Sequence, residues 1–202
     1  DAAAGTYAWT VPDAIDTDIK VRVSDASDSS VSDASDANFT VKGALTLTAP
    51  NGGESWIVGS SHNITWTRTG SIANVELRYS VDGGTGYDYV IVASTDASLL
   101  TYAWTIPDEI GATVKVKVTN VDDTSVYDTS NSNFKIVGSL VVTAPNGGEE
   151  WTVGTSENVT WTVTGSISNV KIDYSVNSGS TYPNAVVAST AAAGLSYAWT
   201  IP

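Results

Sequence analysis

The sequence contains no cysteine and no methionine, it has a single histidine, and its positive charges are few. Without cysteine there is neither a disulfide framework nor a thiol nucleophile. The 9 Lys and Arg residues are outnumbered by 22 Asp and Glu residues, which gives a formal net charge of −13. Nucleic acids and anionic membrane surfaces are bound through clustered Lys and Arg. We therefore expect neither as a partner of this chain.

Long apolar runs and helical patterns are also missing. No run approaches the roughly 18–20 apolar residues that span a membrane, and no stretch shows the spacing of an amphipathic helix. We expect no membrane insertion by these residues. The abundance of Thr, Ser, Gly and Val and the acidic balance are typical of exported β-proteins, so we predict an extracellular location at the cell surface.

What the sequence does contain is a repeat. The motif TYAWT starts at residues 6 and 101 and returns as SYAWT at residue 196, while TAPNGGE starts at residues 48 and 143. Each starting position lies 95 residues from the next, so no insertion or deletion separates the copies. A fixed period constrains the architecture before any other feature is considered. Repeats of this length can bury their own cores, so we expect domains in tandem.

The repeat divides the chain into three segments. Residues 43–137 form one complete repeat, residues 1–42 the last part of a preceding repeat, and residues 138–202 the first part of a following one. We expect the chain to be a window from a longer array. Its partners are then neighbouring repeats of the same chain or fibre.

Short alternating apolar runs, separated by Gly, Asn, Asp and Pro, predict strands throughout. In VELRYS, Val75, Leu77 and Tyr79 share one face, and in TVKVKVT the valines face inward and the lysines outward. The strands expected in the complete repeat are Leu45–Ala49, Trp56–Val58, His62–Arg68, Asn74–Ser80, Tyr89–Ala93, Thr101–Ile106, Thr113–Thr119 and Asn133–Val137. Half-buried strands on both sides of one core form a sandwich. We predict an all-β fold of tandem immunoglobulin-like β-sandwich domains.

The connections between repeats are short. Only Gly138 and Ser139 separate the last expected strand of the complete repeat from the next one, and the earlier junction near residues 42–44 is similar. A linker of two or three residues restricts hinge motion because the domain ends must touch. We expect a semi-rigid, extended array.

The order of motifs resembles a known domain family. PNGGESW, GSSHNITWT, NVELRYSVDGG, TYAWTIPD, KVKV and SNFKIV follow one another in the complete repeat. This order is similar to the Ser-Thr-rich glycosylphosphatidylinositol-anchored membrane-protein family, related to yeast proteins of cell-wall β-glucan synthesis. Prokaryotic cell-surface proteins carry similar domains in tandem. The resemblance implies an extracellular immunoglobulin-like sandwich with a structural or adhesive role, and it supplies no catalytic residue.

Tryptophans have two interpretations. Trp66 shares a strand face with Ile64, and Trp104 shares one with Tyr102, so both are predicted to lie in the core. Trp56 and its counterpart Trp151 follow the glycine-rich PNGGE turn and are the candidates for stacking on a sugar. A solvent-facing row of Trp56 with Tyr87 and Tyr89 would favour carbohydrate binding. Buried tryptophans would favour a structural role.

Acidic segments are candidates for calcium. Ca²⁺ takes six to eight oxygen ligands from carboxylates, carbonyls and water. The candidate ligands are Asp33, Asp36 and Asp128. Their spacing matches no defined calcium loop, and a solvated acidic loop is the alternative. No other metal or cofactor is expected.

Catalytic signatures are missing. His62 aligns with Glu157 in the next copy, and neither a G-x-S-x-G turn nor a phosphate-binding glycine loop occurs. We predict that these residues are not an enzyme. Outward charges reverse between copies, since Glu76 aligns with Lys171 and Arg78 with Asp173. A ligand site common to all repeats would not tolerate that reversal.

Three N-x-Thr sequons start at Asn38, Asn63 and Asn158 and are possible N-glycosylation sites of a glycoprotein. The sequence thus supports two hypotheses about function. The first is a structural stalk, fibre or adhesin shaft at the cell surface. The alternative is a module that binds carbohydrate or cell-wall polysaccharide and is appended to a secreted enzyme.

Overall fold

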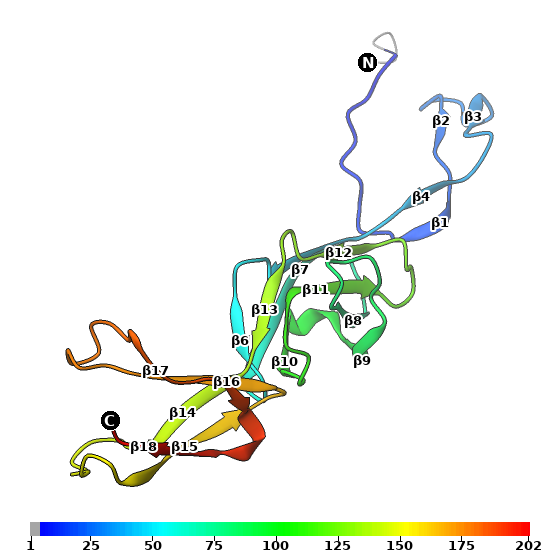
Figure 1. Ribbon diagram of the computed structural model, residues 1–202. Helices are drawn as coiled ribbons and strands as arrows, with labels where there is room; N and C mark the ends of the chain where they lie inside the picture. Colours follow the sequence, from blue (N-terminus) through cyan, green and yellow to red (C-terminus); the bar gives the residue numbers. More distant parts are fainter. Residues whose placement is uncertain (1–4) are drawn as a thin grey trace. The chain divides into compact units, whose positions relative to one another are not determined.

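The computed structural model describes residues 5–202, and short antiparallel strands dominate it (Figure 1). The helices among the described residues are the single 3₁₀ turns η2 (Ala97–Leu99) and η3 (Ala192–Gly194). None of the described helices is long and apolar enough to cross a membrane. The prediction of an all-β fold is confirmed.

The chain forms two compact units, and the boundary between them passes through the complete repeat. The first unit comprises the residues up to Gly52 together with Asn63–Tyr102 and Lys115–Ser132, and the second comprises Gly53–His62, Ala103–Val114 and Asn133–Pro202.

The preceding segment contributes two small antiparallel pairs to the first unit. Its strands are β1 (Asp16–Ile19), β2 (Arg22–Ser24), β3 (Ser32–Ala34) and β4 (Phe39–Val41). β1 pairs with β4, and β2 pairs with β3.

The complete repeat contains two sheets. In the first, the strand order is β10-β7-β5, where β5 is Ala44–Ala49, β7 is Ser61–Thr69 and β10 is Thr101–Thr105. In the second, the order is β6-β13-β11-β8-β9, with β12 also paired to β11. Its strands are β6 (Ser55–Ile57), β8 (Asn74–Ser80), β9 (Tyr89–Asp96), β11 (Gly111–Asn120), β12 (Tyr127–Thr129) and β13 (Phe134–Val137).

The core of the first unit takes apolar side chains from both sheets. β8 and β11 contribute Val75, Leu77, Val116 and Val118, each fully buried. β5 and β7 contribute Leu47, Ile64 and Trp66, which are at most 1% exposed. The indole Nε1 of Trp66 donates to the carbonyl of Ala97 at 3.1 Å, and so crosses from β7 to the turn that follows β9. The predicted inward faces are confirmed, and the complete repeat is an immunoglobulin-like β-sandwich.

The following segment repeats part of this arrangement in the second unit. β14 (Ser139–Ala144), β15 (Ser156–Thr164) and β18 (Ser196–Thr200) form a sheet in the order β14-β15-β18, and β16 (Asn169–Tyr174) pairs with β17 (Asn184–Ala191). Val159, Trp161, Val170 and Ala192 form its buried cluster. Nε1 of Trp161 donates to the carbonyl of Ala192 at 2.9 Å, the counterpart of the Trp66 bond.

All eight strands expected in the complete repeat are present. β8 has the expected bounds, and the other seven have shifted ends. β9 continues to Asp96, three residues beyond the expected end, and the pattern did not reveal the turn that follows it. In that turn a carboxylate oxygen of Asp96 accepts a hydrogen bond from the Ser98 amide at 2.7 Å. β12 was not expected either, because its residues Tyr-Asp-Thr have the composition of a loop. It is held by pairing with β11 and by its Asp128, whose Oδ2 accepts the Leu47 amide at 2.7 Å.

Candidate functional site at the repeat junctions

The sugar-stacking candidates contact other aromatic rings. Trp56 is 8% exposed, and its ring stacks on His62 with centroids 4.5 Å apart and planes 5° from parallel. The Phe134 ring lies 5.0 Å from the Trp56 ring. Trp151 is half-buried and contacts Trp199 edge to face at 6.1 Å. Trp56 therefore belongs to the core and does not form a solvent-facing row with Tyr87 and Tyr89.

The three calcium candidates do not share one site. Asp33 lies on β3, Asp36 in the loop before β4, and Asp128 on β12, where it binds the Leu47 amide. Within residues 5–202, no group of three or more His, Cys, Asp or Glu side chains is arranged to hold a metal ion. Calcium binding remains an untested prediction.

All three sequon asparagines are exposed. Asn63 and Asn158 lie at matching positions on β7 and β15, and Asn38 lies just before β4, where its amide donates to Asp18 at 2.9 Å. Exposure is what glycan attachment requires. Glycosylation remains a prediction.

The reversal of outward charges has a local explanation. Nε of Arg78 lies 2.8 Å from a carboxylate oxygen of Glu76, and Nζ of Lys171 lies 2.8 Å from one of Asp173. Residues two apart on a strand share a face. Reversal of both signs therefore keeps a partly exposed ion pair within the strand.

Tyrosines lie beside this charged face. Nζ of Lys117 lies 4.2 Å from the ring centroid of Tyr127 and 5.8 Å from that of Tyr87. Burial raises the pKa of the Tyr87 hydroxyl, whereas Tyr127 keeps 53% of its surface exposed. A cation over an aromatic face is attracted by the ring quadrupole. Lys117 therefore helps to order both rings.

A second group of contacts occurs where one repeat meets the next. At the second junction, Asp108 of the complete repeat accepts two hydrogen bonds from Ser166 of the following segment. The Ser166 amide donates to Oδ1 at 2.9 Å, and its hydroxyl donates to Oδ2 at 2.5 Å. Both oxygens of one carboxylate are thus used by a single residue of the neighbouring repeat.

The first junction repeats these contacts. The Ser71 amide donates to Oδ1 of Asp13 at 2.9 Å, and the Ser71 hydroxyl donates to Oδ2 at 2.5 Å. Asp13 and Asp108 occupy the same repeat position, as do Ser71 and Ser166. The two junctions lie in different units, so each shows the contact separately.

Glycines make room for these contacts. Gly70 and Gly165 precede the two serines, and each has φ of +82°, which favours glycine. A Cβ on Gly70 would lie 3.1 Å from Ile15 and 3.2 Å from Asp13, and one on Gly165 would lie 3.2 Å from both Ile110 and Asp108. The turn can approach the preceding repeat because it has no side chain at this point.

The linkers also pass close to the turns. Lys42 and Gly43 separate β4 from β5, and Gly138 alone separates β13 from β14. A Cβ on Gly43 would lie 2.8 Å from Ile72, and one on Gly138 would lie 2.7 Å from Ile167. Both linkers therefore run against the isoleucine that follows the junction serine.

Hydrogen bonding sets the ionisation of the junction carboxylates. The Ser71 hydroxyl and amide lower the pKa of Asp13, and the Ser166 hydroxyl and amide lower the pKa of Asp108. Donors that favour the charged form lower a carboxyl pKa. Both carboxylates are therefore ionised at neutral pH, when their hydrogen bonds are strongest.

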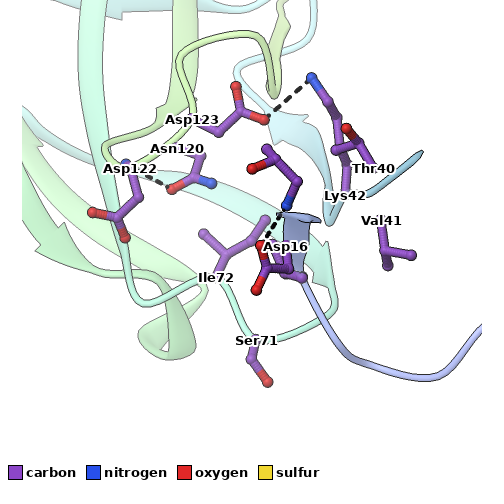
Figure 2. A pocket seen from close by; sticks show the side chains of 11 residues that line it. Asp16, Thr40, Val41, Lys42, Ser71, Ile72, Asn120, Asp122 and Asp123 are labelled. Carbon is purple, nitrogen blue, oxygen red and sulfur yellow. Dashed lines mark hydrogen bonds and ion pairs between the residues drawn. The ribbon is translucent and has the colours of Figure 1, made fainter. Parts of the chain in front are cut away.

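The first junction has an additional ion pair. Nζ of Lys42 lies 3.2 Å from Oδ2 of Asp123 and also donates to the Ser125 hydroxyl. Figure 2 shows this pair at the edge of a pocket that the Asp16, Ser71 and Asn120 side chains also line. Val137 occupies the position of Lys42 at the second junction. The Asp–Ser contact is thus common to both junctions and the lysine contact is not.

Sequence reasoning expected contact between neighbouring repeats but did not identify its residues. The junction residues lie in two motifs that both repeat in the sequence. P-D-x-I occurs at residues 12–15 and 107–110, and T-G-S-I occurs at residues 69–72 and 164–167. Both keep the 95-residue period. Only the structure brings an Asp of one repeat to a Ser of the next.

Comparisons with known proteins add little about function. No protein-family model matches the chain, and no curated protein matches it. Among solved structures, the chain is similar to fibronectin(III)-like modules of Clostridium thermocellum CbhA, with 19% sequence identity and a TM-score of 0.30. The similarity covers 78% of this chain and 79% of that chain. At this level it supports no inference about what the chain does.

Proposed function

We propose that the chain is a structural segment of an extracellular cell-surface protein, in which 95-residue sandwich repeats follow one another as a stalk, fibre or adhesin shaft. One observation carries this proposal. The same two hydrogen bonds connect neighbouring repeats at both junctions, between residues that keep the repeat period. A shaft needs such a repeated connection, whereas a single binding module does not.

Other features agree with this function. The linkers contain one or two residues, which leaves little freedom for independent movement of neighbouring repeats. The strongly negative charge favours solubility of a long exposed chain. The exposed sequons add positions where glycans would attach if the source organism makes them.

The proposal is tested in two ways, on intact cells and on purified chains that differ in their number of repeats. Antibodies against the complete repeat should label intact cells, and small-angle scattering of chains with increasing numbers of repeats should show a maximum dimension that grows in proportion to that number. A compact envelope whose dimension grows with the cube root of chain length would refute the shaft. Labelling only after cell lysis would refute the surface location.

A second function is favoured by one observation. Tyr127 is 53% exposed beside Lys117, so the complete repeat carries an exposed aromatic surface at Tyr127, of the kind that stacks on sugars. If this surface binds cell-wall polysaccharide, Tyr127→Ala should release the chain from purified cell walls. Trp56→Phe is the matched control, because Trp56 is buried. Equal retention of both variants would exclude this second function.

A further inference from the structure

The two junctions use one pair of motifs. At each, the Asp of P-D-x-I in one repeat binds the Ser of T-G-S-I in the next, with the same distances of 2.9 and 2.5 Å. Between the two copies of P-D-x-I, the third residue changes from Ala14 to Glu109 while Asp and Ile remain. The contact therefore depends on the residues common to both copies.

The chemistry of the pair is selective. A carboxylate offers two acceptor oxygens and no donor, and the Ser in the glycine turn offers two donors, its amide and its hydroxyl. Hydrogen bonds of this kind are short and strong because the acceptor is charged. An Asn would supply only one acceptor oxygen, and an Ala in place of Ser would supply only one donor.

Apolar contacts support the hydrogen bonds. The Ile of P-D-x-I lies against the glycine that precedes the Ser, and the linker glycine lies against the Ile of T-G-S-I. Each motif thus contributes one polar and one apolar contact. Together with a very short linker, these contacts leave few orientations that satisfy all of them.

We propose that the P-D-x-I segment of each repeat is a docking surface for the T-G-S-I turn of the next repeat, and that this pair of motifs fixes the orientation of successive repeats. The partner is another copy of the repeat in the same array. This inference rests on the proposed structural function and adds the residues that set its geometry. The Lys42–Asp123 ion pair strengthens the first junction without being required by the docking surface.

The experiment measures distances across each junction in the 202-residue chain. Because the sequence has no cysteine, two introduced cysteines carry spin labels at chosen positions only. Exposed positions 55 and 162 report on the second junction, and exposed positions 32 and 67 report on the first. Pulsed electron paramagnetic resonance then gives the distribution of distances for each pair.

In the unmodified background we expect one narrow distance peak for each pair. Asp108→Ala should abolish the narrow peak across the second junction and leave the first unchanged, and Asp13→Ala should do the reverse. Ser166→Ala should broaden the peak, whereas Ser166→Thr keeps both donors and should restore it. Glu109→Gln is the matched control, since it removes a neighbouring charge that is not part of the contact.

The outcomes separate the docking proposal from the function. Narrow peaks that persist in Asp108→Ala and Asp13→Ala would overturn the proposal, as would broadening in Glu109→Gln equal to that in Asp108→Ala. Circular dichroism of each variant checks that the sandwich remains folded, which is expected because Asp108 and Asp13 are exposed. Absence of the protein from the cell surface would refute the proposed function and leave the docking result standing.

Discussion

The complete repeat and the following segment have matching strands but differ in burial. Leu47 on β5 is 1% exposed, whereas Val142 at the same position on β14 is 52% exposed. Trp66 and Trp161 are both buried, at 1% and 5%, and both donate to the carbonyl of an alanine in a 3₁₀ turn. Leu47 lies opposite Trp66 and Val142 lies opposite Trp161, so the difference in burial arises at the β14 strand and not at its tryptophan partner on β15.

The comparison separates local pairing from formation of the core. β5, β7 and β10 pair in the same order as β14, β15 and β18, and β5 pairs with β7 in the same register as β14 with β15. Residues 138–202 align with 43–107 and include no counterpart of β11, β12 or β13. In the complete repeat, Asp128 of β12 bonds directly to Leu47 of β5, the residue whose counterpart Val142 is exposed.

The largest test of this comparison is truncation at the matched β5 and β14 positions. Leu47→Ala should lower the unfolding free energy of the complete repeat by about 2–5 kcal/mol, because it leaves a cavity in a packed core. Val142→Ala should change the stability of the following segment by less than about 0.5 kcal/mol, as at other exposed positions. Urea denaturation followed at assigned amide resonances of each segment measures both. Equal losses of unfolding free energy would show that Val142 is packed as tightly as Leu47, which would contradict the difference in burial.

A smaller effect is expected at the PNGGE turns. Gly52 and Gly147 both have positive φ, so alanine costs about 1–3 kcal/mol of backbone strain at either position. A Cβ on Gly52 would also collide with the side chain and backbone of Ser132, whereas one on Gly147 meets no atom within 4 Å. Gly52→Ala should therefore cost at least about 1 kcal/mol more than Gly147→Ala. Equal costs in the same urea experiment would contradict the close approach at Gly52.

Much of this comparison could be predicted from the sequence. The alternation in VELRYS and KVKV gave the correct inward faces, because one side of each strand is buried and the side-chain period is two. The glycine-rich PNGGE segments are predicted to be turns, and their glycines have the positive φ that an Asn-Gly-Gly turn adopts without strain. In the second PNGGE turn, Glu149 accepts hydrogen bonds from the amides of Asn146 and Gly147 at 2.7 and 2.8 Å.

What could not be predicted depends on contacts between distant residues. Trp56 looked like a candidate for exposure because it follows a glycine turn, but Phe134, 78 positions later in the sequence, covers its ring. β12 is too short to show a period, and its Asp128 reads as a loop residue until its bond to Leu47 is seen. The junction motifs P-D-x-I and T-G-S-I are each ordinary turn sequences. Their pairing is a property of the folded chain.

The loops after β8 and β16 differ in a titratable residue, so the two segments should respond differently to pH. Asp82 of the complete repeat accepts hydrogen bonds from the Ser80 hydroxyl at 2.5 Å and the Gly86 amide at 3.1 Å, and these bonds lower its pKa. In the following segment Asn177 accepts the Thr181 amide at 3.0 Å instead. A folded pKa below the unfolded value means that stability is present above the unfolded value of about 3.9 and is lost as pH falls through the folded pKa.

The loop of the complete repeat should therefore loosen below about pH 4, and the loop of the following segment should not. The amide resonance of Gly86 should shift between about pH 5 and pH 2, while that of Thr181 stays in place. Asp82→Asn should remove the shift, because Asn keeps an acceptor oxygen that does not titrate. A shift at Gly86 that survives in Asp82→Asn would assign the titration to another group.

The smallest expected effect is that of removing calcium. The candidate carboxylates Asp33, Asp36 and Asp128 lie apart, and Asp128 already accepts the Leu47 amide. An ion held in the native state at 100 times its dissociation constant would add about 2.7 kcal/mol, which for a domain of this size corresponds to a rise of roughly 10–20 °C in Tm. We expect a chelator to change the Tm by less than about 1 °C, because the candidates do not come together with other carboxylates in a group that could hold the ion among the described residues. Since the following segment contains none of the three candidates, its amide exchange rates serve as the internal control. A chelator that lowered the Tm and increased exchange at β12, but not at β15, would show that the complete repeat binds calcium. The burial difference between the two segments would then depend on a bound ion as well as on β11, β12 and β13.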